Sequence, residues 1–66
     1  MNLTWQDSDQ IAWQLSDNNP NVDPLSLSFT RLREMVLALP DFYGKAEDSN
    51  EALLEAIQMA WYEEVR

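Results

Sequence analysis

The chain has 66 residues, and its twelve acidic residues against four basic ones give a formal net charge of −8. A chain of this length folds as one domain, here residues 1–66, with a small core. It contains no cysteine, no histidine and a single glycine, which excludes disulfides, histidine-dependent nucleophilic triads and Gly-rich phosphate loops, so we expect that the protein is not an enzyme.

The first predicted helix begins at Asp7, a favourable N-cap residue that has the capping-box spacing with Gln10. Its narrow apolar face consists of Ile11, Ala12 and Leu15. Trp13 lies off this face, which makes it either a surface residue or part of a contact site. The helix is expected to end within residues 17–20, because Asn favours turns and Pro disfavours helix in the residue before it.

The second predicted helix follows a short turn. Asp23 and Pro24 form a cap followed by Pro at the first helical position, which predicts a single helical turn. Phe29 before Thr30 indicates a hydrophobic residue preceding an N-cap. The stripe that follows has the spacing i, i+3, i+4, i+7 and consists of Leu32, Met35, Val36 and Leu39. Pro40 ends the helix.

The third predicted helix follows a loop over residues 41–47 that contains Gly44. Asp48 or Ser49 is expected to cap it, and Asp48 with Glu51 has the capping-box spacing. Its buried face consists of Leu53, Leu54, Ile57, Ala60 and Trp61. Three helices predict a small all-α three-helix bundle. The spacing also fits a helix-turn-helix-like arrangement, which periodicity alone does not distinguish from a simple bundle.

Six of the seven aromatic residues fall into two groups. Four lie at cap or stripe positions and are expected in the core: Trp5, Phe29, Phe42 and Trp61. Trp5 shares with Leu3 a segment that alternates with polar residues and is expected to lie extended against the core. Trp13 and Tyr62 fall off the stripes and are candidate partner anchors, because interfaces favour Trp and Tyr.

The acidic residues are the candidate functional groups. Glu51 and Glu55 are one helical turn apart and project to the same side, and Asp48 precedes them. Carboxylate oxygens suit hard cations and bind Fe(II) weakly, so an iron site here would be labile. The alternative is that Asp48 and Glu51 only complement the positive N-terminus of the helix.

The charge also indicates the kind of partner. A net charge of −8 repels nucleic acid and anionic membranes and favours basic partners or cations, although the same acidity can simply keep a small protein soluble. The bases Arg31, Arg33 and Lys45 are scattered and are expected to pair with acids such as Glu34.

No apolar run approaches the ~20 residues of a membrane span, and the N-terminus lacks the features of a signal peptide. We therefore expect a cytoplasmic monomer that binds neither nucleic acid nor membrane.

Two blocks of sequence carry a resemblance to a known family. The first contains Leu3, Trp5, Asp7, Ser8, Ile11, Leu15, Asp17, Pro20, Asp23, Pro24, Phe29 and Thr30. The second contains Asp41, Phe42, Ser49, Asn50, Glu51, Leu54, Glu55, Ala56, Ile57, Trp61, Glu63 and Glu64. Over essentially the whole chain these blocks resemble the IscX family, the small acidic proteins encoded with the bacterial machinery that assembles iron–sulfur clusters.

The resemblance implies a winged-helix-like relative that binds the cysteine desulfurase IscS. It implies docking on a basic surface near the desulfurase active site, where frataxin competes, and modulation of sulfur delivery, with weak Fe(II) binding and no tightly bound cofactor. The alternative is a ferrous iron donor for cluster assembly. The partner-binding acids that match the family are Asp7, Asp17, Asp23, Asp41, Glu51, Glu55 and Glu64. The candidate iron ligands are Asp41, Asp48, Glu51 and Glu55.

One loop departs from the family pattern. The family continues after Asp-Phe with a run of aspartates, whereas this chain has Tyr43, Gly44 and Lys45 there, and Pro40 stands where an acid is common. The loop has therefore lost local negative charge, which weakens the case for metal binding there. Docking on a basic partner is affected less, because long-range steering depends on the summed charge.

Overall fold

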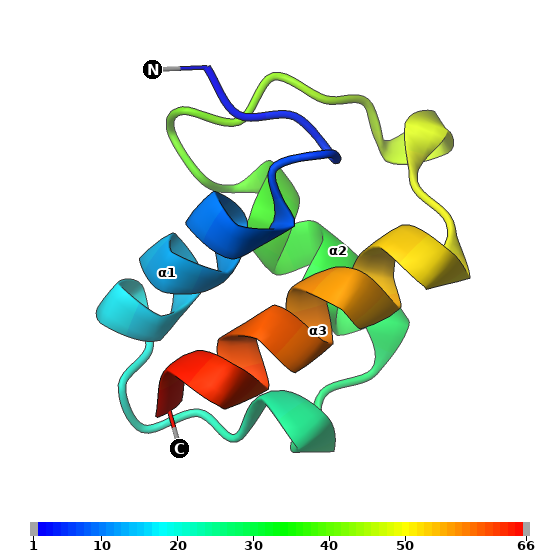
Figure 1. The fold of residues 1–66 in the computed structure, drawn as a ribbon. Coiled ribbons are helices and arrows are strands. Elements are labelled where there is room, and N and C mark those ends of the chain that lie inside the picture. The colour runs from blue at the N-terminus through cyan, green and yellow to red at the C-terminus, as the bar shows by residue number, and fades with distance from the viewer. Residues whose placement is uncertain (1, 66) are drawn as a thin grey trace.

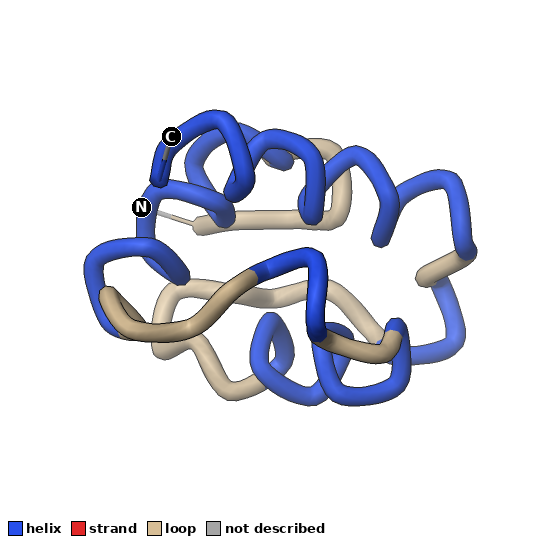
Figure 2. Tube along the Cα trace, turned by 90° about the horizontal axis from the view of Figure 1, so that it is seen from below, coloured by secondary structure: helices blue, strands red, loops and turns tan. Residues whose placement is uncertain are grey.

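The computed structural model describes residues 2–65, which form a small all-α bundle of three helices and two short 3₁₀ turns. The elements in chain order are α1 (Ser8–Asn18), η1 (Pro24–Ser26), α2 (Phe29–Leu37), η2 (Ala46–Asp48) and α3 (Glu51–Val65). In Figure 1, α1 and α3 lie side by side and α2 crosses behind α3. Figure 2 shows only helices and loops in this part of the chain. The predicted all-α three-helix bundle is confirmed.

The helix-turn-helix or winged-helix relationship stays a prediction. Residues 2–65 contain no β-strand, and their one strand-like feature is an isolated parallel bridge between Leu3 and Phe42. None of the helices in the described range is long and apolar enough to cross a lipid bilayer.

The helix α3 is the centre of the bundle, because it packs against α1, α2 and η1. It is rich in strong helix formers such as Ala, Leu and Glu. The buried core residues of the three predicted stripes are Ile11, Ala12, Leu15, Leu32, Val36, Leu39, Leu54, Ile57 and Trp61. The remaining stripe residues, Met35, Leu53 and Ala60, are partly buried against them. The predicted apolar faces are therefore confirmed for α1 and α3, and for α2 as far as Val36. Leu39 is buried as predicted, but it lies beyond the end of α2 at Leu37, so this helix ends before the predicted stop at Pro40.

The segment before α1 covers one end of the core. Figure 1 shows that it runs beside the loop after α2. The Leu3 N–H donates to the Asp41 carbonyl at 2.7 Å, and the Tyr43 N–H donates to the Leu3 carbonyl at 2.9 Å. The Trp5 ring meets the Phe42 ring edge to face at 4.7 Å between centroids. Leu3 and Trp5 are both buried, so the prediction that they lie extended against the core is confirmed.

The predicted N-caps of α1 and η1 have different outcomes. Asp23 caps η1 as predicted, because its Oδ1 accepts a hydrogen bond from the Leu25 N–H at 3.0 Å. Asp7 stands at the N-cap position of α1, but it makes no side-chain cap there. Its Oδ2 instead accepts from the Thr4 N–H at 2.8 Å. The capping box with Gln10 is therefore wrong, because Asp7 stabilises the turn that leads into the helix.

The helix α2 begins before the predicted position. Ser28 is its N-cap, with extended backbone angles (φ −72°, ψ 158°) and an Oγ that accepts from the Arg31 N–H at 3.1 Å. Thr30 is already inside the helix, so its assignment as the cap is wrong. Phe29 becomes the first helical residue and packs partly buried against the core, which places the helix start closer to η1.

The N-cap of α3 is also not the predicted residue, because the η2 turn precedes the helix. Asn50 Oδ1 accepts from the Leu53 N–H at 2.9 Å, so neither Asp48 nor Ser49 caps the helix. Both predicted residues are used by the η2 turn: the Asp48 N–H donates to the Lys45 carbonyl, and the Ser49 N–H and Oγ both donate to the Ala46 carbonyl. The predicted capping box is wrong because this turn occupies its first residue.

Replacing Asn50 by alanine is expected to lower the free energy of unfolding by about 0.5–2 kcal/mol, the usual loss when an N-cap side chain is removed. The matched control is Asp48→Ala, which removes an exposed side chain without a hydrogen bond in residues 2–65 and should change stability by less than about 0.5 kcal/mol. Urea unfolding followed by far-ultraviolet circular dichroism measures both. Equal losses for the two variants would contradict the assignment of the cap.

Candidate functional site

The acidic side chains of the described residues lie at the surface. None of them is buried, and Asp7 and Asp41 are the two that are half-buried. The predicted ion pairing of the bases is confirmed at one place: Arg31 Nη1 lies 3.8 Å from Glu34 Oε1. Both side chains are more than half exposed, so this pair contributes only about 0–1 kcal/mol to stability. Most of the negative charge therefore faces solvent.

Two of the predicted partner-binding acids accept hydrogen bonds from neighbouring residues through their side chains. Asp7 accepts hydrogen bonds from the backbone N–H and the hydroxyl of Thr4, and Asp23 caps η1 through the Leu25 N–H. The side chains of the other five make neither an ion pair nor a hydrogen bond with any residue of the range 2–65: Asp17, Asp41, Glu51, Glu55 and Glu64. Their carboxylates are free to meet a partner.

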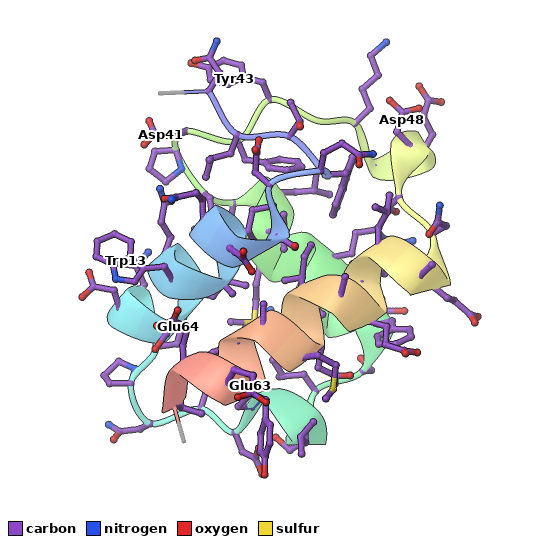
Figure 3. The ribbon with its side chains drawn as sticks, in the orientation of Figure 1. Trp13, Asp41, Tyr43, Asp48, Glu63 and Glu64 are labelled. Atoms are coloured by element: carbon purple, nitrogen blue, oxygen red, sulfur yellow. The ribbon has the colours of Figure 1, made fainter. Side chains whose placement is uncertain are left out.

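The structure does not bring the four predicted iron ligands together. Figure 3 places Asp41 on the side of the molecule where α1 lies, and Asp48 at the opposite end beside the start of α3. Asp48 is the last residue of η2, and Glu51 and Glu55 lie on the first two turns of α3. All three side chains are exposed. Within residues 2–65, no group of three or more acidic side chains is placed to hold a metal ion.

Glu51 has a structural role that the sequence left as an alternative. It is the first residue of α3 and the acidic residue of its first turn, where a carboxylate complements the positive end of the helix dipole. Glu55 lies a turn further along, and the dipole effect falls off within the first turn. Glu55 therefore has no such structural explanation.

The four aromatic residues predicted for the core are buried or partly buried, and the two candidate anchors differ from each other. Trp5, Phe42 and Trp61 are buried, and Phe29 is partly buried against the core. Trp13 is 55% exposed on α1, whereas Tyr62, the other predicted anchor, is only partly exposed.

Two exposed residues of interest were missed by the sequence reasoning. Tyr43 is 67% exposed beside buried Phe42, and the alternation of the extended loop is the signal that could have placed it outside. Asp9 is exposed on α1, and its spacing of four residues before Trp13 is the signal for a shared helix face.

A shallow hollow of about 220 Å³ lies between the end of α1 and the helix α2. Its lining residues include Leu15, Asn19, Met35 and Leu39, and the one charged residue among them is Arg31. The hollow contains no carboxylate, so it is separate from the acidic surface.

These features define a small all-α protein with a strongly negative charge and several exposed carboxylates that make no ion pair in the described range. The chain matches the family model described as iron–sulphur cluster assembly over residues 3–66. It is also 47% identical over 64 residues, which is 97% of each chain, to a protein of Pseudomonas aeruginosa described as uncharacterized. The chain therefore belongs to the iron–sulfur cluster assembly family of the IscX type, and the resemblance noted in its sequence is confirmed.

Proposed function

We propose that this chain is a non-catalytic, acidic adaptor of iron–sulfur cluster assembly that binds the cysteine desulfurase IscS and modulates its delivery of sulfur. We place its action in the cytoplasm, as a monomer. The observation that carries the proposal is the set of acidic side chains that make no ion pair or hydrogen bond within residues 2–65: Asp9, Asp17, Asp41, Glu47, Asp48, Glu51, Glu55 and Glu64. A surface of this kind presents its charge to a partner instead of using it internally.

The physical basis of the proposal is electrostatic steering. Uncompensated carboxylates sum to a negative field that accelerates encounter with a basic surface and disfavours acidic partners. A basic surface near the desulfurase active site, where frataxin also docks, is a partner of the required sign. Occupation of that surface would alter access to the active site and hence the rate of sulfur release.

The loop that departs from the family pattern changes where the docking charge lies. Tyr43 and Lys45 project from it in place of acids, and its backbone is held against Leu3 and Trp5. We therefore assign the docking charge to α1 and to the region from η2 to the first turns of α3, and we assign no iron ligand to residues 43–45.

The alternative function, a ferrous iron donor, is supported by one observation. Glu51 and Glu55 are exposed, lie one helical turn apart and have no partner within the described range. With Asp48 nearby in the chain, they would hold Fe(II) as a cargo through oxygen ligands alone. Asp41 lies on another side of the molecule and would not take part in the same site.

Titration of the protein into IscS is expected to give binding that weakens on the order of tenfold when salt rises from about 0.01 M to about 0.15 M, because the Debye length falls from about 30 to about 8 Å. Isothermal titration calorimetry measures the affinity, and sulfide release with and without Fe(II) measures the effect on the enzyme. Binding that does not respond to salt, or no binding at low salt, would contradict the adaptor. Stoichiometric Fe(II) uptake without IscS would then favour the iron donor.

A further inference from the structure

One face of α1 combines an exposed indole with two carboxylates. The helix buries Ile11 and Leu15 against the rest of the core. Asp9, Trp13 and Asp17 follow one another at intervals of four residues, which aligns their side chains along one stripe of the helix. All three are exposed, and Figure 3 shows Trp13 projecting outward from α1. We call these three residues the Trp13 face.

Packing does not explain why a tryptophan stands at this position. The other two tryptophans of the chain, Trp5 and Trp61, are 4% and 0% exposed, whereas Trp13 is 55% exposed. The Trp13 side chain makes no aromatic ring pair and no hydrogen bond with any residue of the described range. Single exposed apolar side chains are common on protein surfaces, so a binding role for Trp13 requires suitable groups around the indole.

Those groups make the Trp13 face suited to a cation. The helix α1 contains no basic residue, so nothing on the same helix neutralises the carboxylates one turn before and one turn after the indole. Asp17 also lies in the last turn of α1, where the helix dipole is negative and a further negative charge is unfavourable. A cation that binds there would relieve this repulsion and interact with the face of the indole.

From this arrangement we infer that the Trp13 face is the anchor for an arginine on the basic surface of the partner protein. A guanidinium stacks on an aromatic ring and pairs with carboxylates through its planar set of donors, and it is less strongly hydrated than an ammonium. The inference rests on the proposed function for the identity of the partner, IscS. The chemistry of the site, an indole between two carboxylates, is independent of that identity.

The first test observes the indole directly. The Trp13 side chain is exposed, and the indole N–H signals of the buried Trp5 and Trp61 are internal controls in nitrogen–proton correlation spectra. Addition of IscS, and separately of a hexa-arginine peptide, should shift the Trp13 signal saturably while the two control signals stay in place. Replacement of Asp9 and Asp17 together by asparagine should weaken the response to the peptide.

The second test measures affinity for IscS. Trp13→Ala is expected to weaken binding about tenfold or more, as for an aromatic anchor of an interface. The matched control is Leu25→Ala, because Leu25 is similarly exposed, at 51%, but lies in η1. This control should bind like the unmodified protein. Unfolding curves of both variants confirm that neither substitution acts through stability.

The outcomes separate this inference from the proposed function. Salt-dependent binding to IscS that Trp13→Ala leaves unchanged would overturn the Trp13 anchor and retain the adaptor. No binding to IscS, with a Trp13 signal that still responds to hexa-arginine, would overturn the adaptor and retain an arginine site for another basic partner. A Trp13 signal that responds to neither probe would overturn the inference.

Discussion

Trp61→Ala is expected to lower the free energy of unfolding by about 3–5 kcal/mol, the usual loss when a buried Trp is truncated. Trp61 is fully buried on α3, the helix that contacts α1, α2 and η1, so the cavity would open at the centre of the bundle. Small domains bury only about 60% of their unfolded surface and have little stability in reserve. We expect this variant to be substantially unfolded at room temperature, as measured by urea titration.

Trp61→Phe is the matched variant and should be far less damaging. The Trp61 Nε1–H is buried and has no hydrogen-bond partner in the described part of the chain, and an unsatisfied buried donor costs about 1–3 kcal/mol. Phenylalanine removes this donor and keeps most of the ring, so the two effects partly cancel and the loss should stay below about 1.5 kcal/mol.

Trp5→Phe provides the contrast for this experiment. The Trp5 Nε1–H donates to the Lys45 carbonyl at 2.7 Å, so the same substitution removes a hydrogen bond instead of an unsatisfied donor. It should therefore cost about 0.5–1.5 kcal/mol more than Trp61→Phe. The reverse order would mean that the Trp61 donor is satisfied, for example by a buried water molecule.

Gly44→Ala is expected to lower the free energy of unfolding by about 1–3 kcal/mol through overpacking. A Cβ at Gly44 would lie 2.6 Å from Phe42 Cζ and 2.8 Å from Trp5 Nε1. Neither ring can move freely, because both are buried and in contact, and the Trp5 indole is hydrogen bonded to the Lys45 carbonyl. Gly44 does not have a positive φ, so the penalty comes from the contact and not from the backbone conformation.

The sign of this effect makes the experiment decisive. A Gly→Ala substitution at a position with room normally stabilises a protein by about 0.4–1 kcal/mol, because it restricts the unfolded chain. A neutral or stabilising Gly44→Ala would thus disprove the close packing of this loop against Trp5 and Phe42. The control is Lys45→Ala, an exposed neighbour that should change stability by less than about 0.5 kcal/mol. Near-ultraviolet circular dichroism would report any displacement of the rings.

The helices and their buried faces could be predicted because helical periodicity is a local property. The stripe from Leu32 to Leu39 and the face that contains Leu54, Ile57 and Trp61 both follow from spacing along the chain. The side-chain caps were less predictable, since Asp48, Ser49 and Asn50 are all suitable caps in isolation. The η2 turn uses the first two, and only then does Asn50 become the cap of α3.

For the acidic surface, too, some properties follow from the sequence and others only from the structure. Composition alone determined the charge of −8 and the lack of His and Cys, and these limit any metal site to oxygen ligands. The position of each carboxylate required the fold. Asp41 and Asp48 are seven residues apart in the chain, yet the loop between them carries them to different sides of the molecule.

The sequence by itself determined the three helices, their apolar faces, the acidic character and the membership of the family. The tertiary structure decided how the ends of the bundle close: the Leu3–Phe42 bridge, the bond from Trp5 to the Lys45 carbonyl and the resulting lack of space at Gly44. Trp5 and Lys45 are 40 residues apart, and no local pattern encodes a contact across that distance. Such contacts form only when the packed helices bring the two segments together, because the loss of chain entropy must be offset by burial elsewhere in the core.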